Sequence, residues 1–121
     1  MIAVFLGAVF GFLAVLMGSL GAHRLSGTVG EARLRTWERA VRYQMLHAAV
    51  LVAAGAVIRA QGVSGLASAA IWLWAAGIIL FCGSLYVMAG AGHDRLSFVT
   101  PAGGVLLLAG WLALAAYALG G

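Results

Sequence analysis

The chain has 121 residues, of which 64% are hydrophobic and only 8% are charged. Polar side chains at that frequency cannot cover a globular surface in water, so a soluble domain is excluded and lipid must be the solvent. The formal charge of +4 comes from seven arginines, without a lysine, against three acidic residues.

Four apolar segments are long enough to cross a bilayer, because a helix of about 20 residues covers the ~30 Å hydrocarbon layer. They occupy residues 2–22, 40–58, 66–91 and 98–119. Their connections are short, so consecutive helices must run antiparallel. The sequence therefore predicts an all-α integral membrane protein, in which residues 1–121 form a single domain, a four-transmembrane-helix antiparallel bundle.

The placement of the arginines predicts how the chain is oriented. Only Arg59 lies beside the second connection, whereas the other arginines flank the first and third connections: Arg24, Arg33, Arg35, Arg39, Arg42 and Arg95. The positive-inside rule places those two connections in the cytoplasm and both termini outside it. Attraction to anionic lipid headgroups explains this basic charge, so we expect membrane lipids as partners and no nucleic acid.

The first connection has the pattern of a helix. Thr28 and Glu31 have the spacing of a capping box, and apolar residues including Trp37 then recur at helical spacing. This pattern predicts a short interfacial amphipathic helix between spans one and two, with Trp37 at the depth of the headgroups. Glu38 and Arg42, four residues apart, are expected to pair.

Small residues recur every seven positions along the spans, and in span two His47 occupies the middle position of such a row. Such rows let helix backbones approach closely, which is how helices associate in lipid. We expect each row to face a neighbouring helix. The rows are Gly7, Ala14 and Gly21; Ala40, His47 and Ala54; Ala70, Gly77, Ser84 and Ala91; Gly103 and Gly110.

Polar side chains gather in the cytoplasmic half of the spans, as a candidate polar pocket or interhelical network. Its candidate members are His23, Arg39, Tyr43, Gln44, His47, Ser84, Tyr86 and Thr100. His47 lies about 10 Å into the membrane, where an ionisable group is either functional or a neutral side chain bonded across helices. Ser84 falls at nearly the same depth and could meet His47. The outer half is apolar, small or aromatic, which disfavours a continuous pore.

Several segments at these positions resemble a known family. They are GSLGAHRL at Gly18, WERAVRYQMLHA at Trp37, FCGSLY at Phe81 and TPAGGVLLLAGWL at Thr100. In order and spacing they look like the YgdD-like family of small inner-membrane proteins, domain of unknown function 423. The family pattern maps to Gly18, Gly21, Ala22, His23, Tyr43, Gln44, His47, Gly83, Ser84, Tyr86, Thr100, Pro101, Gly103 and Gly104, while Leu20 stands where an aromatic residue is expected.

The resemblance implies four spans, a location in the bacterial inner membrane and mitochondrial relatives in eukaryotes. The family has no established activity, so the resemblance implies no catalytic residue.

Three classes of function remain open. We favour a structural or accessory membrane protein, which could form a homo-oligomer or join a larger membrane complex. The alternative is a binder or transporter of a lipid or small amphipathic molecule, through the cytoplasmic-side polar pocket, with Arg39 or Arg42 on its anionic group.

The third class is an enzyme or redox protein. His23 and His47 are offset by ~10 Å of helical rise, which is awkward for the axial ligands of a haem. Carboxylates are absent from the spans, which disfavours paired-carboxylate catalysis and most metal sites. We therefore expect neither catalytic activity nor a cofactor.

Overall fold

The computed structural model describes residues 1–120, within which four helical spans are long and apolar enough to cross a membrane. The first span is α1 (Ile2–Leu20), which continues into a π-helical segment, η1 (Gly21–Leu25), and the second is α2 (Glu31–Gln61). The third joins α3 (Gly65–Gly77), the π-helical η2 (Ile78–Cys82) and α4 (Gly83–Ala91), and the fourth is α5 (Val99–Ala118). The predicted all-α membrane fold is confirmed.

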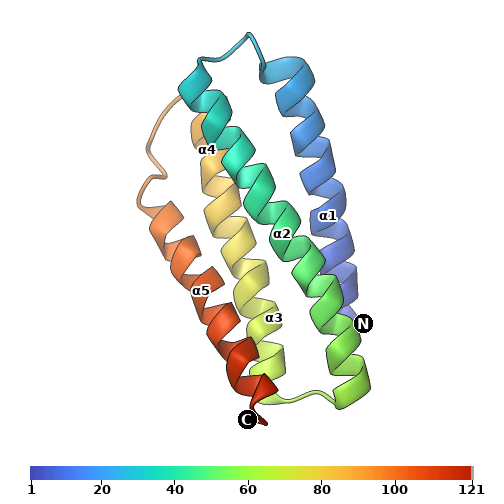
Figure 1. Ribbon diagram of the computed structural model, residues 1–121. Helices are drawn as coiled ribbons and strands as arrows, with labels where there is room; N and C mark the ends of the chain where they lie inside the picture. The colour runs from blue at the N-terminus through green and yellow to red at the C-terminus, as the bar shows by residue number, and fades with distance from the viewer. Residues whose placement is uncertain (121) are drawn as a thin grey trace.

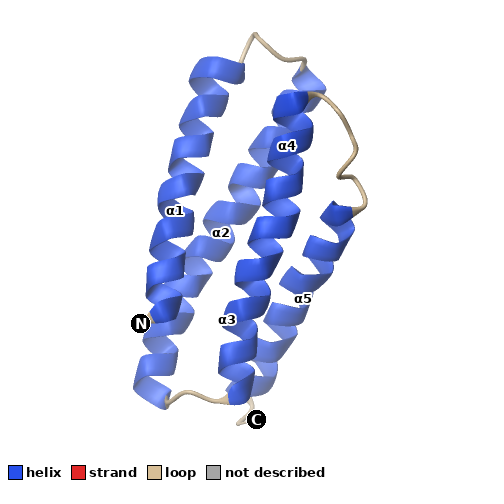
Figure 2. Ribbon diagram, turned by 180° about the vertical axis from the view of Figure 1, so that it is seen from behind, coloured by secondary structure: helices blue, strands red, loops and turns tan. Residues whose placement is uncertain are grey.

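The four antiparallel spans are arranged in a row (Figure 1). α1 packs mainly on α2, while α5 packs on α3 and η2. Figure 2 shows the same order from behind, with α1 and α5 at opposite edges. The α1–α2 and α4–α5 connections lie together at one end, called here the arginine end, and both termini lie at the other end.

The rows of small residues lie where the helices meet, as predicted. Gly7, Ala14 and Gly21 are all buried, as are Gly103 and Gly110 on α5. A Cβ atom added to Gly7 would lie 2.7 Å from the carbonyl oxygen of Ala48 on α2, so only glycine permits this approach. The seam of span three ends sooner than predicted, because Ala91 is exposed.

The π-helical segment η2 lies where α5 crosses span three most closely. A Cβ atom on Gly103 would lie 2.7 Å from the Cα atom of Phe81, and closer still to its backbone nitrogen. The Phe81 ring packs against Tyr43 of α2, with ring centroids 4.8 Å apart. Phe81 therefore contacts both helices that flank span three.

The first connection differs from the predicted interfacial helix. The helix that begins at Glu31 runs without interruption to Gln61, so the arginine-rich segment is the start of span two itself. Trp37 is buried against α1, and its indole N–H donates to the Met17 carbonyl across a distance of 2.7 Å. Gly21 makes room for it, since a Cβ atom there would lie 2.8 Å from the indole ring.

Two local contacts expected in this segment are not formed. Gly30 occupies the N-cap of α2, and the Thr28 hydroxyl donates to the Arg24 carbonyl, so the capping box is wrong. Within residues 1–120 the ion pair is between Arg35 and Glu31, at 3.8 Å, and not between Glu38 and Arg42. Both partners in that pair are exposed, so it contributes little to stability.

Gly103→Ala should lower the free energy of unfolding by about 1–3 kcal/mol, because the methyl group must displace the backbone of η2. Gly104→Ala is the matched control: its Cβ would meet only the edge of the Phe81 ring, at 3.6 Å. Unfolding in a mild detergent compares the two variants. Equal stability of both would show that α5 does not approach η2 as described.

Candidate functional site

His47 bonds α2 to α5. Its side chain is 3% exposed, its Nδ1 lies 2.8 Å from the carbonyl oxygen of Tyr43, and its Nε2 lies 3.0 Å from the indole nitrogen of Trp111. An indole nitrogen can only donate, so Nε2 accepts and Nδ1 must carry the proton that is donated to Tyr43. His47 is therefore a neutral imidazole with both ring nitrogens engaged.

Two tryptophans surround this imidazole. The His47 ring centroid lies 6.5 Å from that of Trp74 and 5.9 Å from that of Trp111, and the tryptophan centroids are 5.2 Å apart, all in edge-to-face geometry. Trp74 is fully buried, beside Gly110. Its Nε1 has no hydrogen-bond partner, whereas the other buried side-chain nitrogen and oxygen atoms within residues 1–120 have one. We call these three rings the aromatic layer.

A second set of bonds joins α4, α2 and α1. The Tyr86 hydroxyl donates to Gln44 Oε1 across 2.7 Å, and Gln44 Nε2 donates to the Phe10 carbonyl across 2.8 Å. Trp37 packs its ring edge-on to Tyr86, with centroids 4.7 Å apart. Gln44 is therefore bonded on both sides within the membrane.

A third contact joins span three to α5. The Ser84 hydroxyl donates to the Phe81 carbonyl, 2.9 Å away, and its oxygen also contacts the Thr100 hydroxyl. Because the single Ser84 proton is already used, Thr100 must donate to Ser84. The expected meeting of Ser84 and His47 is not formed, because each side chain has other partners.

The predicted network is only partly formed. Gln44, His47, Ser84, Tyr86 and Thr100 are joined by the bonds described above. The remaining candidates lie outside them: His23 and Arg39 are exposed, and Tyr43 is 42% exposed and contributes its backbone carbonyl and its ring.

Sequence reasoning missed Trp111 and Arg33. Trp111 sits on a leucine-rich span and carries no signal of a hydrogen-bonding role until α5 is placed beside α2. Arg33 donates from Nε to the Ala89 carbonyl at 2.8 Å and from Nη2 to the Gly90 carbonyl at 2.9 Å. It thereby satisfies free carbonyls at the C-terminal end of α4, where a cation is favoured. Gly92, with φ of 76°, marks that helix end and is the one available sequence signal.

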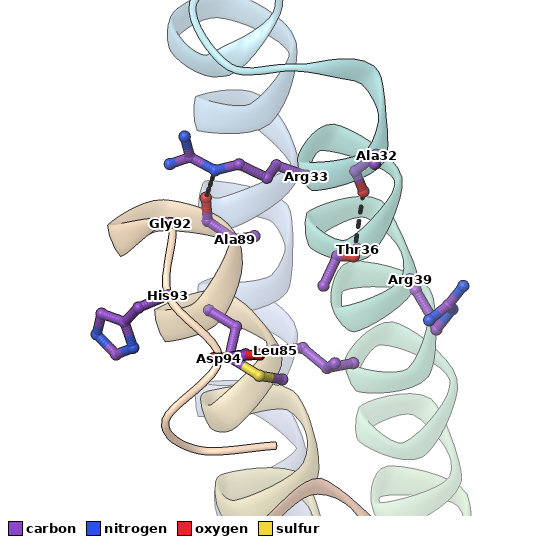
Figure 3. Close-up of a pocket in the computed structure, with 10 residues that line it drawn as sticks. Ala32, Arg33, Thr36, Arg39, Leu85, Ala89, Gly92, His93 and Asp94 are labelled. Carbon is purple, nitrogen blue, oxygen red and sulfur yellow. Dashed lines mark hydrogen bonds between the residues drawn. The ribbon is translucent and has the colours of Figure 1, made fainter.

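Two of the hollows beside α2 contain residues of the predicted polar set. The upper hollow, of about 570 Å³, lies between α2 and α4 at the arginine end and is lined by Arg33, Thr36, Arg39 and Asp94, among others (Figure 3). The lower hollow, of about 390 Å³, lies between α2, η2 and α5 and is lined by Tyr43, His47, Phe81, Gly104 and Trp111, among others. Within residues 1–120, His, Cys, Asp and Glu side chains do not gather in groups of three or more that could hold a metal ion.

Four apolar helical spans, joined by short connections and bonded to one another by buried polar side chains, define a small multi-span integral membrane protein. A family model described as "Protein of unknown function (DUF423)" matches residues 17–104. The chain belongs to this family, which confirms the resemblance seen in its motifs.

Curated relatives support the same assignment. The chain is 39% identical to a UPF0382 membrane protein of Staphylococcus aureus strain bovine RF122, over 92% of this chain and 89% of the relative. It is 37% identical to the UPF0382 membrane protein YwdK of Bacillus subtilis, over 90% and 89%, and 38% identical to a UPF0382 membrane protein of Haemophilus influenzae, over 89% and 86%. No solved structure gives a significant match.

His47→Ala should lower the free energy of unfolding by about 0.6–2 kcal/mol, as expected for the loss of an interhelical hydrogen bond in a membrane protein. Trp111→Phe removes the same bond but keeps an aromatic ring. The double variant should therefore lose less stability than the sum of the losses of the two single variants, with a coupling energy of about 0.6 kcal/mol. Detergent unfolding of the four proteins measures this coupling. Trp72→Phe, at an exposed position on α3, is the control, and strict additivity of the His47 and Trp111 variants would contradict the bond.

Proposed function

We propose that the protein is a non-catalytic structural or accessory component of the membrane, whose bonded helices form a rigid support. The observation that supports this function is the use of its buried polar side chains. Gln44, His47 and Ser84 are the buried polar residues among those described, and each is bonded to its own helix or to a neighbouring span. Their hydrogen-bonding groups are used in helix association, so few remain to bind a substrate.

The chemistry of His47 supports the same proposal. To act as a general base, the imidazole must accept a proton at Nε2, and that nitrogen already accepts the Trp111 N–H. Protonation would set two donors against each other and open the contact between α2 and α5. The carboxylates Glu31, Glu38 and Asp94 are all exposed, away from this ring, so none of them orients it for catalysis.

An accessory protein needs surface with which to meet other proteins. The outer faces of the edge helices carry large exposed apolar side chains, such as Phe5 and Phe12 on α1 and Leu112 on α5. In the proposed role these faces contact lipid, a second copy or a larger membrane complex.

We also propose that the arginine end faces the bacterial cytoplasm and that both termini lie outside it. Both connections at that end carry arginines, while Arg59 lies near the opposite end of α2. The positive-inside rule predicts this orientation in the inner membrane.

The orientation can be measured with single cysteines in a Cys82→Ala background. Ser26→Cys lies at the arginine end and Val63→Cys in the opposite connection, and both positions are exposed. A maleimide that cannot cross the membrane should label Val63→Cys in intact cells, and Ser26→Cys only after the cells are opened. The reverse pattern would invert the proposed topology.

A structural role predicts that function follows stability, whichever bond is lost. His47→Ala, Trp111→Phe and Ser84→Ala remove different parts of the bonded set, so complementation of a deletion strain should decline in the order of their measured stabilities. Trp72→Phe again serves as the control. A His47 variant with wild-type stability and no complementation would show instead that the imidazole itself acts on a ligand or proton.

A further inference from the structure

The two hollows beside α2 lie in line. Arg39 lines the upper hollow, and Tyr43 and His47, one and two turns further along α2, line the lower one. The opposite wall follows the same order, since Leu85 of α4 lines the upper hollow and Phe81 of η2 lines the lower. The two hollows have no lining residue in common, but they follow one another along the same face of α2, from the arginine end into the apolar part of the protein, and we call this line of hollows the furrow.

The upper hollow contains charges of both signs. Arg33 crosses from α2 to the end of α4, whereas Arg39 lies at the other edge of the hollow with its guanidinium pointing away from Arg33 (Figure 3). Arg33 uses Nε and Nη2 on carbonyls, which leaves Nη1 available, and within residues 1–120 Arg39 makes neither a side-chain hydrogen bond nor an ion pair. Asp94, from the connection to α5, supplies a carboxylate to the same hollow.

The lower hollow is apolar and has aromatic walls. Tyr43, Phe81 and Trp111 line it, and Gly104 opens it, because a Cβ atom there would meet nothing closer than the Phe81 ring at 3.6 Å. The polar atoms of His47 and Trp111 are already bonded to each other, so this wall presents ring surfaces. An acyl chain is the natural occupant of such a groove.

We propose that the furrow binds one phospholipid with a phosphoethanolamine headgroup. Arg33 donates to the phosphate from Nη1, the unbonded Arg39 side chain turns toward it from the edge of the hollow, and Asp94 holds the primary ammonium. One acyl chain follows α2 from Arg39 to His47, a rise of about 12 Å, into the lower hollow. This lipid site does not depend on the structural role proposed above. It gives the protein a specific lipid ligand in addition to that role.

The mixture of charges selects this headgroup over other common ones. A purely anionic headgroup would satisfy the two arginines but leave the Asp94 carboxylate facing negative charge. Phosphocholine carries a positive charge but no N–H donor for the carboxylate. Phosphoethanolamine matches both signs and supplies the donors.

The test is native mass spectrometry of the full chain in detergent, with added phosphatidylethanolamine, phosphatidylglycerol or phosphatidylcholine of identical acyl chains. Phosphatidylethanolamine should be retained best, and Arg39→Gln should weaken its retention about tenfold, the effect of losing a charge-assisted hydrogen bond. Arg42→Gln is the matched control, because Arg42 is exposed on the same helix but lines neither the upper nor the lower hollow. Equal retention of the three lipids, or equal effects of the two variants, would overturn the proposal.

Two further variants separate the headgroup from the chain. Asp94→Asn should abolish the preference for phosphatidylethanolamine over phosphatidylglycerol while phosphate binding persists. Gly104→Leu should fill the groove and reduce retention of every lipid, whereas Ala102→Leu, at an exposed position of α5 outside the groove, should not. Unchanged retention in Gly104→Leu would exclude the groove as the chain site. Detergent unfolding of each variant shows whether stability changes separately, so failure of the lipid site is distinguishable from failure of the structural role.

Discussion

The hydrogen bond from Trp111 to His47 directly joins α2 and α5, two spans that otherwise have little direct contact. α5 packs chiefly on α3 and η2, and α2 packs on α1 and on span three, so the direct link between α2 and α5 is made by side-chain bonding. The imidazole provides it, since one nitrogen is anchored to the carbonyl of Tyr43 and the other receives the indole N–H of α5. In hydrocarbon, water cannot replace either partner if the helices separate.

Much of the fold follows from signals of two kinds. Continuous apolar runs predict the four spans, and small residues at seven-residue spacing predict the faces that meet, as the burial of Gly7 and Gly103 confirms. The start of α2 shows where local pattern fails. Trp37 lies among arginines, a pattern typical of an interfacial residue. Its burial depends on Gly21, sixteen positions earlier, which leaves space for the indole. The position of the π-helical η2 is not predictable from local sequence either, because it depends on how α5 packs against Phe81.

The sequence predicts which polar residues of the candidate site are buried better than it predicts their hydrogen-bond partners. The seven-residue rows place His47 and Ser84 inward, and both are buried, as is Gln44. Their partners come from tertiary contacts: the Phe10 carbonyl on α1, the Trp111 indole on α5 and the Thr100 hydroxyl. His23 was included because of its chemistry, yet it lies in the exposed turn of η1. Arg33 was counted only as surface charge, although it caps the end of α4.

These features divide the protein into a bonded interior and the two hollows beside α2. The central claim is that His47 is neutral, carries its proton on Nδ1 and accepts a hydrogen bond at Nε2. Nitrogen-15 solid-state NMR of histidine-labelled protein in lipid bilayers measures this directly, with His47→Gln to assign the signal. The account predicts a protonated Nδ1 and an unprotonated, hydrogen-bonded Nε2 for His47 at neutral pH, and an imidazolium or an Nε2-protonated tautomer would contradict it.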